Sequence, residues 1–411
     1  MSYDTAASSA QPHSRPQAAQ PHAAPPELQA QTQAPPQPVF ADPVVPSNSR
    51  LAWGIAGIVV GALALLGVLA YMLLALGPVL LVASSVLALV PLAIVLYGVL
   101  WIDRWEPEPR GLLLFAFLWG SGVSVAVALI VGFGIDTVVD GAVIDAGTYE
   151  FLGAVVQAPV VEEVAKGLGV LLIFLVARRY FDGPVDGVVY ASVAAAGFAF
   201  TENILYFAAS MAESGLVSAD ATMTFFLRGI MSPFAHAMFT AMIGLFIGLW
   251  GRRSTMGGIA GFFVGLVFAI TLHALWNATS YLGLLGWFAV YVIVQMPLFA
   301  GAIVLVVQLR KRETLLTQER LAEYAAAGWI SPQEVATLGT ASGRRHARQW
   351  AKANGMGAHM ERYIRDATRL AFARQRIVSG RDRIGAQKDE LVLLAQVTAS
   401  RQALMAAPRL G

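Results

Sequence analysis

The sequence predicts an all-α fold, a polytopic bundle of about eight transmembrane helices, and three observations lead to this class. Of the 411 residues, 57% are hydrophobic and only 13% are charged, whereas about 25% of a soluble domain is charged. The apolar residues form long runs between Leu51 and Leu309. Most Lys and Arg residues lie beyond these runs or in the short gaps between them. Together these features exclude an ordinary soluble domain.

Residues 1–50 form the first predicted segment, a disordered tail. They are rich in Pro, Gln and Ala, a composition that cannot bury enough apolar surface to offset the entropy lost on ordering. They also lack the basic and short apolar regions of a cleaved leader, so we expect the first apolar run to be a retained signal anchor. The chain has no cysteine, which excludes disulfides, thiolate nucleophiles and Cys-ligated zinc.

Residues 51–309 are predicted to be the transmembrane domain. Each apolar run is long enough to cross a hydrocarbon core of ~30 Å as a helix. Loops with Arg follow the second, fourth, sixth and eighth runs, whereas the opposite loops carry Asp and Glu. Because positively charged loops stay in the cytoplasm, we expect a bacterial-type multi-pass cell-membrane protein with both termini cytoplasmic. The predicted spans are 51–76, 79–101, 111–133, 150–177, 188–211, 225–250, 256–280 and 285–309.

Glycines four residues apart suggest where these helices meet, since small side chains let two backbones approach closely in lipid. Gly257, Gly261 and Gly265 form one such stripe, and Gly244 with Gly248 forms another. We therefore expect the sixth and seventh spans to pack tightly.

Residues 310–411 are predicted to be a cytoplasmic helical basic tail. Ser331-Pro332-Gln333-Glu334 has the pattern of a helix start, with a capping Ser, Pro at the first position and Glu at the third. Further helices are expected at about 342–378 and 384–405. The many Arg residues predict contact with anionic lipid headgroups of the cytoplasmic leaflet. No nucleic acid is expected as a partner, because no recognised binding motif accompanies the charge.

Four consecutive predicted spans carry ionisable groups inside the membrane. Each such group costs about 2.5–3.5 kcal/mol on insertion scales, so these groups commonly serve ion pathways or catalysis. With a rise of ~1.5 Å per residue, they lie about 10–18 Å below the outer surface and can converge on one point. The candidates are Glu162, Glu163 and Lys166 in the fourth span, Glu202 in the fifth, His236 in the sixth, and His273 and Asn277 in the seventh.

This cluster is compatible with more than one chemistry. Peptide hydrolysis needs an activated water and donors aimed at the developing oxyanion, and a buried carboxylate can act as the base. Alternatively, His236, His273 and a glutamate such as Glu202 could bind zinc; a glutamate-only mechanism would need no cofactor. A proton- or ion-coupled transporter is the competing function. The single shared depth and the absence of symmetry between two halves argue against it.

The same residues carry a family resemblance that covers about residues 80–310. The motifs are Glu162-Glu163-x-x-Lys166, Phe198-x-x-x-Glu202, the separate histidines His236 and His273, and the acidic loop DRWEPEP at 103–109. In this combination the chain resembles the PrsW family of bacterial membrane proteases. It is more distantly similar to the CPBP group, which includes type II CAAX prenyl endopeptidases and uses EExxxR, FxxxH and HxxxN.

The resemblance implies an intramembrane endopeptidase, a metallo- or glutamic-type enzyme that cleaves membrane-associated proteins, with anti-sigma factors as one substrate class. The chain matches the HxxxN motif but has Lys166 in place of Arg and Glu202 in place of His. The implied roles are a general base for Glu162 or Glu163, water positioning or metal binding for Glu202 and His236, and oxyanion stabilisation for His273 with Asn277.

Overall fold

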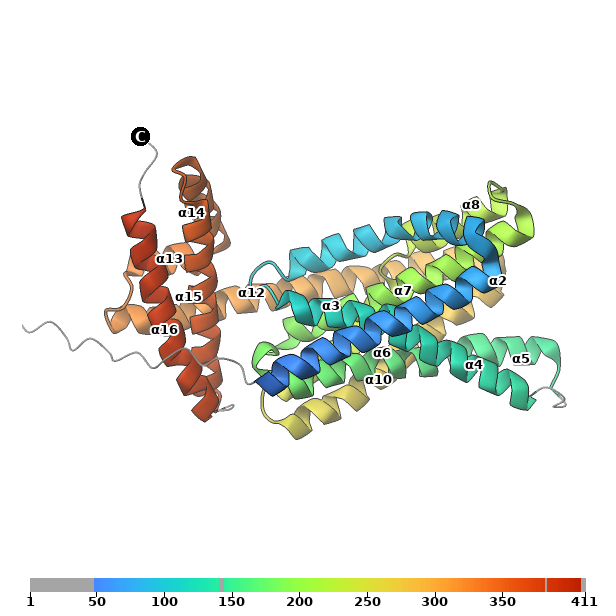
Figure 1. Cartoon of the computed structure of the whole chain (residues 1–411), viewed down its shortest axis with the longest axis horizontal. Helices are drawn as coiled ribbons and strands as arrows, with labels where there is room; N and C mark the ends of the chain where they lie inside the picture. The colour runs from blue at the N-terminus through green and yellow to red at the C-terminus, as the bar shows by residue number, and fades with distance from the viewer. Residues whose placement is uncertain (1–47, 140–143, 381–382, 408–411) are drawn as a thin grey trace, which may run out of the picture. The chain divides into compact units, whose positions relative to one another are not determined.

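The structure, a computed structural model, describes residues 48–139, 144–380 and 383–407, and in these ranges every regular element is a helix (Figure 1). The all-α class is therefore confirmed. The predicted disordered tail lies almost entirely outside the described residues.

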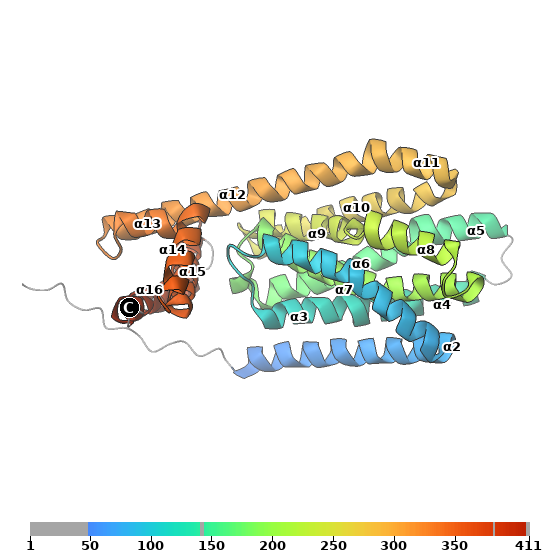
Figure 2. The same cartoon turned by 90° about the horizontal axis from the view of Figure 1, so that it is seen from above.

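The chain is a multi-pass membrane protein, and seven of the eight predicted spans fall in apolar stretches of membrane-crossing length, whereas the fourth, 150–177, is mainly helical but is not among these stretches. Within the described residues, five continuous stretches are long and apolar enough to cross a membrane by length and composition. Two of these reverse direction at glycines with positive φ, Gly77 (76°) and Gly283 (66°) (Figure 2). The helices are α2 (Asn48–Ile102), α3 (Arg110–Leu118), α4 (Val125–Val139), α5 (Ala146–Leu152), α6 (Ala158–Val176), α7 (Pro184–Ser214), α8 (Ala219–Phe225), α9 (Ala235–Gly251), α10 (Thr255–Ala278), α11 (Gly283–Val290) and α12 (Met296–Ala326).

Turns of π-helix join several of these helices into longer stretches. They are Trp119–Ser124 before α4, Gly153–Gln157 before α6, Phe226–Met231 after α8 and Tyr291–Gln295 before α12. A π turn adds one residue to a helical run and commonly lies at a functional site. The last three border the candidate site or the cavities described below.

The loops with Arg residues gather at one end of the bundle, as the charge pattern predicts. Arg178 donates to the carbonyl of Gly251 (3.2 Å), and Arg252 donates to that of Asp182 (3.3 Å). Trp105 donates to Thr317 (3.0 Å), which lies on α12 beyond the apolar run. These contacts join the loops that follow the second, fourth, sixth and eighth predicted spans.

Helix α7 lies at the centre of the packing. Every residue from Pro184 to Phe198 is buried, as expected for a helix surrounded by others. Gly187 of α7 faces Gly244 of α9 so closely that a Cβ on either would lie within 2.0 Å of the other's carbonyl oxygen. The glycine stripe on α10 packs against α9 as predicted, because a Cβ on Gly261 would meet the Phe246 carbonyl at 2.3 Å. The α9 glycines, by contrast, contact α7.

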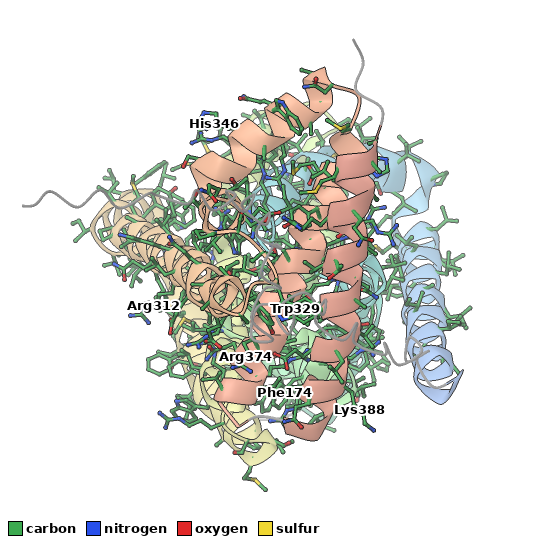
Figure 3. All side chains as sticks on the ribbon, turned by 90° about the vertical axis from the view of Figure 1, so that its left-hand side faces the viewer. Phe174, Arg312, Trp329, His346, Arg374 and Lys388 are labelled. Atoms are coloured by element: carbon green, nitrogen blue, oxygen red, sulfur yellow. The ribbon has the colours of Figure 1, made fainter. Side chains whose placement is uncertain are left out.

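The C-terminal helices are α13 (Pro332–Leu338), α14 (Ala341–Ala353), α15 (Gly357–Val378) and α16 (Arg383–Ala406). The predicted capping box at Ser331 and Glu334 is present. The single helix predicted at 342–378 is wrong, because the chain turns at Gly355, whose φ of 73° interrupts the helix. Figure 3 shows the side of Figure 1 on which these helices are drawn, and His346, Arg374 and Lys388 are labelled on them.

Helix α12 crosses the predicted domain boundary at residue 310 without a break. Its part beyond the apolar run contributes Leu321 and Tyr324 to the core of the C-terminal helices, where they join Leu338 and Leu370. One continuous helix therefore belongs to both the membrane bundle and the C-terminal region.

Candidate active site

Four helices bring the predicted ionisable residues together inside the bundle. Glu163 and Lys166 on α6 are fully buried, and Glu162 is 7% exposed. They meet Glu202 from α7, His236 from α9 and His273 from α10, and the contacts given below link all six side chains.

Interruptions in two helices shape this region, and each lies next to a proline. Pro159 lies in the first turn of α6, directly after a π turn. Pro233 lies in the break between Met231 and Ala235, so α9 begins just before His236. Since proline removes a backbone donor and clashes with the preceding turn, it favours such breaks. His236 consequently stands in the first turn of its helix.

Glu163 is fixed by three partners. Its carboxylate lies 2.6 Å from Lys166 Nζ and accepts hydrogen bonds from Thr240 Oγ1 (2.8 Å) and from His273 Nδ1 (3.0 Å). A buried carboxylate needs such partners, because leaving it uncompensated is strongly destabilising. Glu163 therefore sets the orientation and tautomer of His273, and the Nε2 atom of that ring is left to face the centre.

Glu202 is held in a second carboxylate network. Its Oε2 lies 2.5 Å from Arg228 Nη2 and accepts a hydrogen bond from His236 Nε2 (2.9 Å). Arg228 also donates to Asn203 (3.0 Å), and its guanidinium lies over the Tyr206 ring at 3.7 Å. Glu202 thereby orients His236 as Glu163 orients His273.

The two imidazoles and Glu162 face one another at the centre. The rings of His236 and His273 have centroids 5.1 Å apart and perpendicular planes. Glu162 Oε2 lies 3.9 Å from His273 Nε2 and 3.4 Å from Lys166 Nζ. One ligand atom each from Glu162, His236 and His273 lie within 4.8 Å of one another. This donor set suits a divalent metal such as zinc, which binds His nitrogen and carboxylate oxygen at about 2 Å.

The wider surroundings of the three donors also fit a metal. Ligating histidines typically donate their second N–H to a carboxylate, which fixes the ring, and both histidines do so here through Glu163 and Glu202. The remaining nitrogen of His236, Nδ1, lies 3.4 Å from Lys166 Nζ, so a metal bound there would take the place of this ammonium contact. The three carboxylates face two permanent cations, Lys166 and Arg228, so this group has one net negative charge when both histidines are neutral. Such a charge favours binding of a cation.

Two predicted residues are placed differently from the rest. Asn277 donates to the carbonyl of Ala154 (2.8 Å) in the π turn before α6, so its amide is engaged with that turn. Glu202 is a predicted metal ligand, but the group of three close donors contains Glu162 in its place.

Arg228 and Thr240 belong to the site although sequence reasoning missed them. A lone arginine in an apolar run is itself unusual and could have been noticed. Thr240, one turn after His236, is an ordinary residue of a membrane helix.

The acidic loop at 103–109 lies outside the membrane-spanning segments and contacts the central helix. Asp103 accepts a hydrogen bond from the Glu108 N–H (3.0 Å), and Tyr190 of α7 donates to Glu108 (2.5 Å). Burial raises the pKa of Asp103 to about 6 and holds the pKa of Glu108 well above its usual range. The loop is thus tied to α7, the helix that carries Glu202.

Comparison with known proteins agrees with the resemblance inferred from the motifs. Residues 108–302 match the family described as PrsW family intramembrane metalloprotease. The chain is similar to PrsW proteases. Every predicted site residue lies within the matched region.

Three proteins named Protease PrsW are similar over part of the chain. That of Geobacillus kaustophilus is 30% identical over 146 residues, 36% of this chain and 57% of its own length. That of Clostridioides difficile is 27% identical over 195 residues, 46% of this chain and 76% of its own length. That of Oceanobacillus iheyensis is 34% identical over 98 residues, 24% of this chain and 40% of its own length. The chain thus spans 57% of the first relative. No solved structure matches it.

Proposed function

We propose that this protein is an intramembrane endopeptidase that hydrolyses peptide bonds of membrane-associated proteins. One observation carries the proposal: the buried His273 and the half-buried His236, each oriented by its own carboxylate, face Glu162 at the centre of the bundle. Structural helix contacts do not need three carboxylates and two imidazoles at one point, because each is costly to bury. The named relatives are proteases, and nothing in the comparisons favours a transporter.

We propose that the site binds a divalent metal such as zinc. His236, His273 and Glu162 would hold the ion, and their surroundings support this assignment as described above. Such an ion would lower the pKa of a bound water and would polarise the scissile carbonyl. Glu163 and Glu202 hold the two rings in position. Lys166 and Arg228 balance the charge of these carboxylates.

Glu162 has a second candidate role, that of general base in a glutamate-only mechanism. It has fewer fixed partners than Glu163, so its carboxylate is free to approach a water near the two histidines. The metal content of the Glu162→Gln variant distinguishes the two roles. Loss of bound metal supports the ligand role, whereas full metal content with lost turnover supports the base role.

The experiment couples the purified full chain in detergent to a quenched fluorogenic peptide and to a single-span fusion protein. We expect Glu162→Gln, Glu163→Gln and His273→Ala to reduce kcat/KM by at least about 100-fold. Chelation should abolish cleavage, and added Zn²⁺ should restore it. Undiminished activity in all three variants would reject the site, and activity unaffected by chelators would reject the metal.

We further propose that both termini are cytoplasmic, with anti-sigma factors as one substrate class. Because the chain has no cysteine, single cysteines report orientation cleanly. A cysteine replacing the exposed Leu216 should react with an impermeant thiol reagent added outside cells. A cysteine replacing Arg312 should react only after the membrane is opened.

The predicted lipid contact of the C-terminal region is also kept as a proposal. Several of its arginines are paired with acids, such as Arg374 with Glu323 and Arg401 with Glu334. Arg365 and Arg369 are exposed on α15 and are the candidates for headgroup contact. Anionic lipid in nanodiscs should slow amide exchange along this helix, and neutral lipid should not.

A further inference from the structure

Two neighbouring cavities lie near the candidate site, between helix α9, helix α12 and the part of α2 that follows the turn at Gly77. Their volumes are about 410 and 370 Å³, within the range of ligand pockets, ~300–1,000 Å³. They share four lining residues, and together they form a mainly apolar groove. The shared residues are Phe234, Met238, Phe299 and Ile303.

The groove approaches the candidate site through residues of α9 and α10. Ala235 lines it and is followed in the chain by His236. Trp276 also lines it, and its ring lies 6.3 Å from that of Phe239, which stacks on the His273 ring at 5.1 Å. Phe239 and Trp276 therefore lie between the groove and the His273 ring, and the first turn of α9 carries both Ala235 and His236.

The groove is open toward the lipid. Phe299 and Ile303 are 37% and 49% exposed although they lie on an apolar, membrane-spanning part of α12. An occupant can therefore enter sideways from the bilayer.

One polar group in the groove has no apparent role in the fold. Gln295 ends the π turn before α12 and is 6% exposed. Neither its amide nitrogen nor its amide oxygen finds a hydrogen-bond partner among the residues that the structure describes. Each such buried atom costs about 1–3 kcal/mol. We therefore expect the Gln295 amide to form hydrogen bonds with a molecule that binds in the groove.

We infer that the groove receives a transmembrane segment of the substrate, and that Gln295 pairs with a peptide group of this segment. The inference rests on the proposed function and names the form of its substrate. An intact helix satisfies its own backbone groups, so a segment must unwind locally before its peptide bond can be attacked. Unwinding in lipid leaves an N–H and a C=O unpaired. The Gln295 amide offers one acceptor and one donor to them, which an acyl chain could not use.

Disulfide cross-linking tests whether a transmembrane segment binds in the groove. In the chain without native cysteine, Ile303→Cys lines the groove, whereas Val304→Cys is similarly exposed (54%) but does not line it. The probe is a 22-residue Leu/Ala segment in liposomes with central Gly-Ser and one cysteine. Disulfide formation should be at least about fivefold greater at residue 303. Equal cross-linking at the two positions would overturn the inference and leave lipid as the occupant.

Kinetics test Gln295 itself, with Gln308→Leu as the matched control because Gln308 is exposed on α12. Gln295→Leu should raise KM for the single-span fusion protein about tenfold and leave cleavage of the soluble peptide unchanged. Its melting temperature should equal or exceed that of the wild type, since an unpaired buried amide is removed. A lower melting temperature with equal loss on both substrates would show a structural role instead.

The two proposals fail in different ways. If Glu162→Gln, Glu163→Gln and His273→Ala all cleave both substrates at the wild-type rate, the proposed function is wrong. If Glu163→Gln is inactive while Gln295→Leu cleaves the fusion protein with wild-type KM, only the groove assignment is wrong.

Discussion

At the scale of single residues, Lys166 holds the α6 side of the site together. Its ammonium lies 2.6 Å from Glu163 and 3.4 Å from Glu162, and the side chain is fully buried. It also lies over the Phe198 ring at 4.2 Å. Two adjacent carboxylates can stay in this interior because a cation lies between them.

Replacing the Lys166 ammonium should therefore destabilise the folded protein. We expect Lys166→Met to lower the free energy of unfolding by about 3–5 kcal/mol, the typical cost of breaking a buried ion pair, and to abolish activity. Thermal unfolding in detergent measures the change. Lys311→Met is the control, since Lys311 is exposed. Equal melting temperatures for the two variants would contradict the role given to Lys166.

Sequence reasoning predicted the convergence of the acids and histidines because membrane burial makes each of them conspicuous. It could not predict the partner of Asn277, which is a carbonyl in the π turn before α6. A hydrogen bond to that carbonyl depends on a local helix distortion that tertiary packing imposes. The role of Thr240 could not be predicted for a similar reason. Its hydroxyl donates to Glu163 only because α9 packs against α6.

At the scale of elements, close backbone contact decides how α7 and α9 pack. Glycines at 187 and 244 allow the two backbones to touch. The spacing of Gly244 and Gly248 predicted a tight contact with the seventh span, but these two glycines contact α7 instead, because a small-residue stripe has no information about what lies opposite it.

A methyl group at this contact should be poorly tolerated. Gly244→Ala would place a Cβ 1.9 Å from the Gly187 carbonyl oxygen, and overpacking of this kind costs about 1–3 kcal/mol or more. We expect a lower melting temperature in detergent. Gly67→Ala should have no such effect, since nothing lies within 4 Å of its Cβ position.

The acidic loop should make stability depend on pH. Burial raises the pKa of Asp103 from 3.8 to about 6, so the folded state favours the protonated acid. This contribution is fully present below about pH 3.8 and is lost as the pH rises through about 6. In Asp103→Asn, the fall in melting temperature across that window should be smaller than in the wild type. The exposed Asp220→Asn should keep the wild-type profile.

At the scale of the whole molecule, the C-terminal helices are joined to the membrane bundle by buried contacts as well as by α12. Arg344 is 2% exposed and donates to the Trp105 carbonyl (3.0 Å) and to Thr368 (2.7 Å). Its guanidinium also lies over the Trp105 ring at 3.4 Å. The basic composition predicted a tail facing the lipid, but composition could not show that this arginine is internal.

Removing this arginine should loosen the acidic loop. Arg344→Leu leaves the Trp105 carbonyl without its charged donor, a loss of about 1.5–3 kcal/mol. We expect faster amide exchange at residues 103–109 and faster proteolysis between α12 and α13. The exposed neighbour Arg345→Leu should match the wild type. Unchanged exchange in Arg344→Leu would show that the contact is not holding the loop.

The length of α12 has a mechanical consequence. Its 31 residues form one helix that starts next to Gln295 and ends among the C-terminal helices, a rod of about 46 Å. Because the helix has no break, it tilts as one body. If α12 rotates by about 5° about its C-terminal end, its N-terminal end next to Gln295 moves by about 4 Å. A molecule that tilted the C-terminal helices would therefore also move Gln295 within the groove.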